Sequence, residues 1–138
     1  MMALLLDSSA LYALADRHDR WHVPMARAVE AQPGERVVPV TALTEACYMV
    51  GTHLGPAAER RLVRAAVAGE VLIDGPTTAD LARAEKVLEK YADADVGLVD
   101  ASIIAVAERL KIATIATTDH RHFRLFRPRH CRAFILVP

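Results

Sequence analysis

The sequence predicts an α/β protein with three α/β/α layers, in which a central, mainly parallel sheet of four to five strands lies between helices. Short apolar runs alternate with helical segments, a pattern typical of parallel strands joined by helices. The chain is 53% hydrophobic but only 5% aromatic, so Ala, Leu, Val and Ile must fill the core. Its 138 residues suit one domain, and we expect residues 1–138 to form it.

Five apolar runs are predicted to form the strands. In chain order they are MALLL (2–6), VVPVTA (37–42), EVLID (70–74), IATIAT (112–117) and AFILV (133–137). The second run contains Pro39, which has no N–H for a sheet hydrogen bond and is unfavourable inside a central strand.

Six segments between these runs are predicted to be helices. Pro56 and Gly69 bracket one of them in the usual order, with proline at the first position and glycine after the last. Thr77 or Thr78 is a candidate N-cap of the next helix, and 101–110 is almost entirely apolar, which indicates a buried helix. The six segments are residues 8–17, 25–31, 44–54, 56–69, 78–92 and 101–110.

Composition excludes several classes of protein. The formal net charge is zero, so the chain as a whole has no electrostatic preference for nucleic acid. The first residues lack the basic region of a secretory signal, and no run approaches the roughly 18 apolar residues of a membrane span. Two cysteines without CxxC spacing do not suggest a zinc site or a disulfide framework. We therefore expect a cytoplasmic protein without a membrane segment.

Four acidic residues follow predicted strands or stand near the starts of predicted helices. Asp7 follows the first strand and Asp119 the fourth, whereas Glu45 and Asp100 lie near helix starts. Taken singly, each has an ordinary role, as a helix N-cap, a partner of a helix dipole or a turn residue. In a parallel sheet, however, these positions meet at the carboxyl ends of the strands, where such folds bind ligands.

Four carboxylates in one pocket would favour a cation. Like charges raise one another's pKa and destabilise the fold unless something compensates them. Carboxylate oxygens suit Mg²⁺ or Mn²⁺ rather than zinc. Such an ion activates water and neutralises charge that develops on phosphate oxygens, so the acids predict metal-assisted phosphodiester or phosphoryl chemistry.

Four stretches resemble, in order, the successive motifs of PIN-domain proteins: LLLDSSALYALAD, TALTEACYMV, YADADVGLVDASIIAVAERL and IATTDHRHF. In particular, the set resembles the VapC-like ribonuclease toxins of bacterial toxin–antitoxin pairs, and it spans nearly the whole chain. The resemblance implies a PIN fold and cleavage of RNA that depends on one or two Mg²⁺ or Mn²⁺ ions. It also implies a homodimer and a small antitoxin that blocks the groove.

The resemblance also assigns roles to particular residues. The metal-holding, catalytic acids of the family fall on Asp7, Glu45, Asp100 and Asp119. Ser9 and Thr117 match small polar positions near the metal and are expected to have supporting roles, although their hydroxyls would equally cap helices. Asp93 matches an acid often present after the tyrosine of this family, whereas Asp95 has no counterpart. Both are better explained as solvated loop acids than as metal ligands.

The segment 120–132 is strongly basic. Without its arginines, 12 basic residues face 17 acidic ones, so the remainder has a formal charge of −5. The segment is a solvated face, an RNA phosphate track or a contact for an acidic partner. Of its arginines, Arg121 and Arg124 are nearest to the acids and are the candidate RNA-binding residues. The five arginines are Arg121, Arg124, Arg127, Arg129 and Arg132.

We therefore expect a metal-dependent endoribonuclease that acts as a toxin and cleaves RNA by metal-activated water. One alternative is a non-catalytic PIN-fold interaction module, which the four intact acids disfavour. Another is a phosphatase or receiver domain. The phosphatase motif needs an Asp where this chain has Ser9, and a receiver needs its phospho-acceptor after the third strand, where Asp74 precedes Gly75 and Pro76.

Overall fold

A computed structural model describes residues 2–138 and contains one five-stranded sheet in the order β3-β2-β1-β4-β5. All neighbouring strands are parallel, which confirms the predicted fold class. The strands are β1 Ala3–Leu6, β2 Glu35–Val38, β3 Leu72–Ile73, β4 Thr114–Ala116 and β5 Ile135–Val137.

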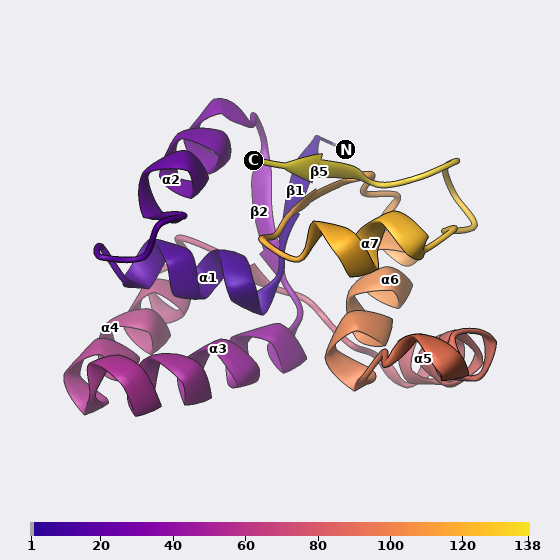
Figure 1. Ribbon diagram of the computed structural model, residues 1–138, viewed down its shortest axis with the longest axis horizontal. Coiled ribbons are helices and arrows are strands. Elements are labelled where there is room, and N and C mark those ends of the chain that lie inside the picture. Colours follow the sequence, from indigo (N-terminus) through magenta and orange to yellow (C-terminus); the bar gives the residue numbers. More distant parts are fainter. Residues whose placement is uncertain (1) are drawn as a thin grey trace.

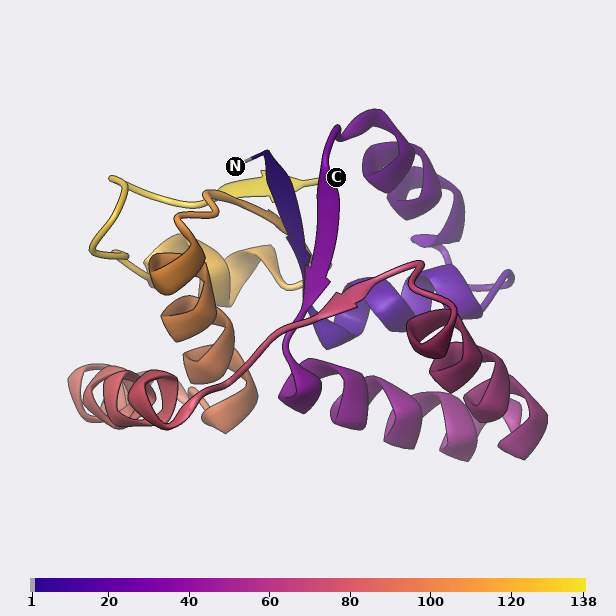
Figure 2. The ribbon, with the colours of Figure 1, turned by 180° about the vertical axis from the view of Figure 1, so that it is seen from behind.

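Helices cover both faces of this sheet (Figures 1 and 2). The connections from β1 to β3 run through α1 to α4 on one side, and those from β3 to β5 run through α5 to α7 on the other. No helix within residues 2–138 has the length and apolar character needed to cross a membrane. The helices are α1 Ser8–Ala15, α2 His22–Ala31, α3 Val40–Leu54, α4 Pro56–Val67, α5 Thr78–Lys90, α6 Leu98–Leu110 and α7 His120–Leu125, with a 3₁₀ turn η1 at Ala92–Ala94.

Among the boundaries that differ from the prediction, the starts of α3 and α6 each change the position of an acid. The second strand ends at Val38, and α3 begins directly after Pro39, so the prediction of a strand through residue 42 was wrong. Proline has the φ angle suited to a helix start and lacks the N–H that a strand needs. As a result Glu45 lies in the second turn of α3. Helix α6 begins at residue 98 rather than 101, so Asp100 lies in its first turn and Gly97 is the N-cap.

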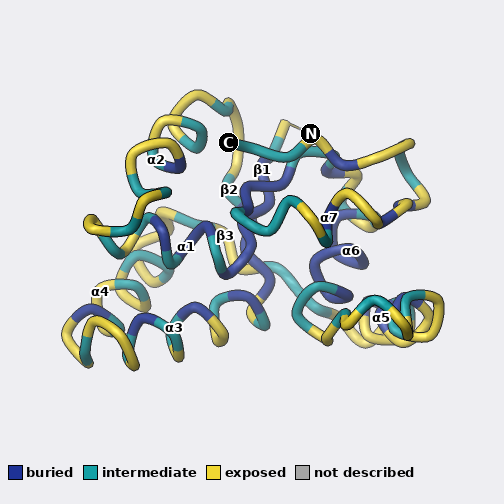
Figure 3. Tube along the Cα trace, in the orientation of Figure 1, coloured by how far each residue is buried: buried dark blue, intermediate teal, exposed yellow. Residues whose placement is uncertain are grey.

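The core is formed by β1, its neighbouring strands and α6 (Figure 3). Leu4, Leu5 and Leu6 are at most 1% exposed, and every residue of α6 from 101 to 107 is buried. This confirms that the apolar helix is buried. Phe123 and Phe126 of the basic segment are each 1% exposed, because they belong to the core cluster and their rings meet edge to face.

The carboxyl ends of β1 and β4 lie side by side, and this positions two of the acids. Leu6 pairs with Ala116 in the parallel register, and the Asp7 N–H donates to the Ala116 carbonyl at 3.0 Å. The Thr117 N–H donates to the Val137 carbonyl at 3.0 Å, which extends the pairing toward β5. The residues that follow β1 and β4 are therefore held at one edge of the sheet.

Away from these acids, an ion pair between the buried Asp80 and Arg109 joins α5 to α6. Asp80 is 3% exposed and accepts from Arg109 Nε at 3.0 Å, and Arg109 Nη2 donates to Asp74 at 2.7 Å. Asp80 and Thr77 form a reciprocal capping box, so Thr77 is the N-cap of α5. Burial raises the pKa of Asp80, but the hydrogen bonds from Arg109 and Thr77 outweigh it and leave this pKa below its usual value. Gly75 has φ +70° and a Cβ there would lie 2.8 Å from Asp80, so only glycine fits.

Replacement of Arg109 by Leu is expected to lower the free energy of unfolding by about 2–3 kcal/mol, because it leaves Asp80 buried without a cation. Arg109 is 33% exposed, which places the loss below the range for a fully buried pair. Urea unfolding near neutral pH measures it. The loss should shrink as the pH falls below 3.8, the ordinary carboxyl pKa, since a protonated Asp80 needs no cation.

The matched control is Lys86→Met on the same helix as Asp80. The Lys86–Glu89 pair is exposed and 3.9 Å long, so its loss should cost no more than about 0.5 kcal/mol. Equal effects of the two substitutions would show that the Arg109 network does not stabilise the fold.

Candidate functional site

Asp7 is the buried member of the acid cluster. It is 4% exposed and directly follows β1. It is also the N-cap of α1, where it accepts from the Ser8 N–H at 2.7 Å. Its second oxygen accepts from Ser9 Oγ at 3.1 Å and from Thr117 Oγ1 at 3.0 Å. Asp7 therefore caps α1 and also belongs to the acid cluster.

Ser9 and Thr117 connect Asp7 to the loop that follows β4. Ser9 Oγ accepts from the Thr118 N–H at 3.0 Å, and Thr117 Oγ1 accepts from the Asp119 N–H at 2.9 Å. The two hydroxyl oxygens lie 3.2 Å apart. Each hydroxyl thus bonds both a carboxylate and a backbone N–H, which fixes the Asp7 side chain relative to Asp119.

Glu45 reaches the cluster from α3. Its Oε1 accepts from Ser8 Oγ, and the same hydroxyl lies 3.4 Å from Asp7 Oδ1. Glu45 is otherwise exposed. Three elements that are distant in sequence, β1, α3 and the loop after β4, therefore supply adjacent oxygen atoms.

Asp100, Asp119 and His122 form the tightest group in the site. One ligand atom from each of the three lies within 4.8 Å of the other two. Asp119 is the N-cap of α7, where its Oδ1 accepts from the His122 N–H at 3.3 Å and its Oδ2 lies 2.8 Å from His122 Nδ1. Asp7 and Glu45 lie outside this group and are joined to it through the hydroxyls.

The part played by His122 was missed in the sequence. The segment after Asp119 was not predicted to be helical, yet Asp119 and His122 are three residues apart on α7 and therefore share a face. An acid that could cap a helix, followed three residues later by a histidine, is the signal that would have indicated this pair.

The electrostatics of the cluster are those of crowded acids. Burial raises the pKa of Asp7, and the neighbouring Glu45 contributes. Burial, followed by the charges of Asp7 and Asp119, raises the pKa of Asp100 to about 7. The hydrogen bond to Asp119 raises the pKa of His122. Four carboxylates are a donor set that suits a divalent cation such as Mg²⁺ or Mn²⁺.

Asp93 and Asp95 lie near His122, at the edge of the candidate site. Both are exposed, and they line a shallow hollow together with Arg121, His122 and Leu125. Neither belongs to the tight group, which agrees with their interpretation as solvated loop acids.

The basic segment, residues 120–132, contains α7 and the loop that follows it. All five of its arginines are exposed. The Arg127 guanidinium donates to the carbonyls of Arg124 and Phe126 and so closes the end of α7. Arg121 and Arg124 lie on α7 itself, which Asp119 caps.

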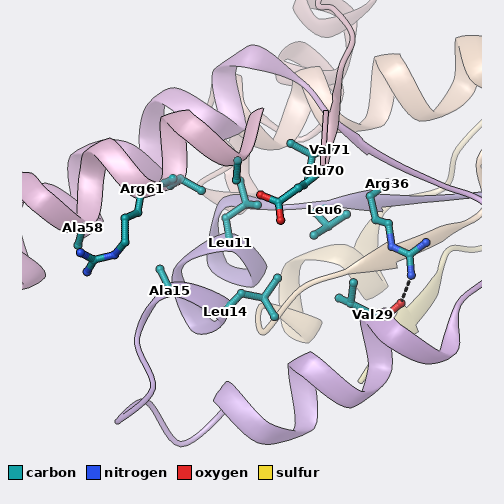
Figure 4. Close-up of a pocket in the computed structure, with 12 residues that line it drawn as sticks. Leu6, Leu11, Leu14, Ala15, Val29, Arg36, Ala58, Arg61, Glu70 and Val71 are labelled. Atoms are coloured by element: carbon teal, nitrogen blue, oxygen red, sulfur yellow. Dashed lines mark hydrogen bonds between the residues drawn. The ribbon is translucent and has the colours of Figure 1, made fainter. Parts of the chain in front are cut away.

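A cavity of about 440 Å³ lies away from the acids, between α1, α2 and α4 (Figure 4). Its walls are mostly apolar, with Leu11 and Leu14 on one side, and Arg36 donates to the Val29 carbonyl at 2.8 Å at its edge. None of the four acids lines it, so it is not part of the candidate site.

Comparison with known proteins gives a consistent result. The PIN domain model matches residues 4–127. Ribonuclease VapC26 of Mycobacterium tuberculosis is 29% identical over 135 residues, which cover 98% of this chain and 100% of that protein.

Two solved structures share the fold. VapC20 of Mycobacterium tuberculosis, a Sarcin-Ricin loop cleaving toxin, has a TM-score of 0.83 at 19% identity and covers 94% of this chain and 98% of its own. The structure of VapBC2 from Rickettsia felis, bound to a DNA fragment from the VapBC2 promoter, has a TM-score of 0.70 at 14% identity. The match covers 98% of this chain and 97% of that one. Since the family model spans most of the chain and the observed parallel sheet between helices agrees with these structures, the chain belongs to the PIN domain family.

Proposed function

We propose that this protein is a divalent-metal-dependent endoribonuclease and the toxin of a toxin–antitoxin pair. The observation that carries the proposal is the convergence of Asp7, Glu45, Asp100 and Asp119 at one edge of the sheet, with the pKa of Asp100 raised to about 7. The chain is similar over nearly its full length to a ribonuclease, VapC26, and this similarity supports the activity. Membership of the PIN domain family argues against the phosphatase or receiver alternative.

The four acids are the proposed metal ligands, for one or two Mg²⁺ or Mn²⁺ ions. When bound, the ion would act as a Lewis acid for hydrolysis of the phosphodiester bond. Ser9 and Thr117 orient Asp7 by donating to the same oxygen, and His122 orients Asp119. These contacts restrain the Asp7 and Asp119 carboxylates before substrate arrives.

The proposed substrate is RNA, and the proposed phosphate contacts are on α7. The rest of the chain has a formal charge of −5, so a local positive surface must hold a polyanion near the acids. Arg121 and Arg124 are exposed on the helix that begins after Asp119, and each guanidinium can donate two hydrogen bonds to one phosphate.

A small cognate antitoxin and a second copy of this chain are the proposed protein partners, in the cytoplasm. The similarity to VapBC2 supports the antitoxin. Co-purification of a tagged copy from its native cell should recover a short protein in near-equal amount.

Mn²⁺ or Mg²⁺ is expected to raise the melting temperature, because the ion relieves repulsion among the acids. The pKa of Asp100 is raised, so its contribution to the stability of the ion-free protein is full below 3.8 and is lost as the pH rises through about 7. Protons compete with the ion, so affinity should be about tenfold weaker near pH 6 than near pH 8. Calorimetric titration with Mn²⁺ measures this, and affinity independent of pH in this range would contradict it.

Asp100→Asn is expected to reduce RNA cleavage by more than about 100-fold while the fold is kept, since it removes a ligand charge and little volume. The ion-free variant should melt at a higher temperature than the wild type near pH 8, because a repulsive charge is gone. Glu85→Gln, an exposed acid on α5, is the matched control and should cleave normally. Growth arrest on expression of Asp100→Asn would instead favour a module that acts by binding, whereas full RNA cleavage in EDTA would overturn the metal-dependent mechanism.

Replacement of both Arg121 and Arg124 by Ala should weaken RNA binding and flatten the slope of log affinity against log salt by about 1–2, since each phosphate contact contributes about 0.7. Cleavage at saturating RNA should change less. The control is Arg60→Ala with Arg64→Ala, two exposed arginines one turn apart on α4, which removes the same charge. Equal losses in the two double variants would show that only net charge matters.

A further inference from the structure

A hollow with aromatic walls lies directly beside the acids. It has a volume of about 320 Å³, at the lower end of the range for small-ligand pockets. Tyr12 of α1, His53 at the end of α3 and Trp21, which precedes α2, form much of its lining. Neither the ion site nor the basic segment accounts for these residues.

The hollow shares a wall with the acid cluster. Ser9 and Thr118 line it, and the Thr118 N–H donates to Ser9 Oγ at 3.0 Å. The same hydroxyl lies 3.1 Å from Asp7 Oδ2. A strand whose phosphate lies at the acids therefore has the hollow next to it, one side chain away.

The aromatic walls are held in place by their neighbours. The rings of Tyr12 and His53 meet edge to face with centroids 5.8 Å apart, and Trp21 meets His120 in the same way, also at 5.8 Å. The backbone N–H of Trp21 donates to Asp19 Oδ1 at 2.8 Å, which fixes the turn that presents the indole ring. Aromatic side chains positioned in this way are the usual platform for unstacked bases.

The charge of the lining favours a base over a phosphate. Asp19 contributes a carboxylate to the hollow, which repels a phosphate but accepts the N–H groups that every RNA base carries. Outside the lining, the Arg20 guanidinium lies over the Trp21 ring, 5.5 Å from its centroid. Arg121 and Arg124 lie on α7. The hollow thus offers a surface for a base, and the arginines of α7 offer a surface for the phosphates.

We propose that this hollow is a base-binding subsite that holds one unpaired nucleotide next to the bond to be cleaved, with Trp21 as its stacking platform. The proposal rests on the proposed function and specifies its substrate as RNA in which a base is free, such as a loop or a single strand. Because a paired base cannot enter, the subsite would reject continuous duplex.

Trp21 is the single tryptophan of the chain, so its fluorescence reports on the hollow alone. The protein used is the Asp100→Asn variant with Mn²⁺, in which RNA should stay intact. Single-stranded RNA pentamers should quench this fluorescence saturably. A self-complementary RNA duplex of the same composition should not, and equal quenching by both would overturn the subsite.

Two substitutions test the hollow without fluorescence, by anisotropy of labelled RNA. Trp21→Leu should weaken the binding of single strands about 5- to 150-fold, the cost of losing one stacked base, whereas Trp21→Phe should retain most of the affinity. His53→Ala changes another lining residue at an exposed position, so a similar loss there supports the subsite even if Trp21→Leu misfolds.

Cleavage by the otherwise wild-type enzyme separates this inference from the proposed function. Mapping the ends of a cleaved random RNA pool should show a base preference beside the cut that fades in Trp21→Leu and His53→Ala. If affinity and preference are unchanged in both variants while cleavage continues, the subsite is overturned and the nuclease stands. If the wild type cleaves no RNA but its single-strand quenching persists, the nuclease fails and the base-binding hollow stands.

Discussion

Repulsion among carboxylates at one edge of the sheet is the constraint on which the rest of this structure depends. The parallel register of β1 and β4 places Asp7 beside the loop that carries Asp119, and α6 adds Asp100. Burial, followed by the charges of Asp7 and Asp119, raises the pKa of Asp100 to about 7, so without a cation the cluster can limit its charge by holding a proton. His122 adds a partial counter-charge through its bond to Asp119. The electrostatic cost of the site and its proposed affinity for a divalent ion therefore have the same origin.

Two acids of this fold show how environment decides what a carboxylate does. Asp80 is buried, but Arg109 and Thr77 donate to it, and its pKa falls. Asp100 is partly buried and has no arginine or lysine partner within residues 2–138, and its pKa rises. The first joins two helices as a charged group. The second is poised between its two protonation states, which is typical of a functional site.

The surfaces around the acids differ in kind. Helix α7 presents Arg121 and Arg124, whereas the turn before α2 presents Trp21 to a hollow that the end of α3 also lines. A polymer with a charged backbone and apolar bases matches such an arrangement, because each part meets a surface of complementary chemistry. Ser9 joins the two regions, since its one hydroxyl contacts Asp7 and lines the hollow.

The sequence by itself determined the alternation of strands and helices and the edge of the sheet at which the acids meet. Both follow from local patterns, namely apolar runs, helix-boundary residues and the position of an acid directly after a strand. Local patterns misplaced the start of α3, since the starting role of Pro39 was outweighed by the apolar residues around it. Tertiary structure alone decided that His122 joins Asp100 and that Trp21 and His53 line one hollow. Those contacts join segments that are distant in sequence, and the packing of helices on the sheet sets their separation. No local propensity encodes such a distance.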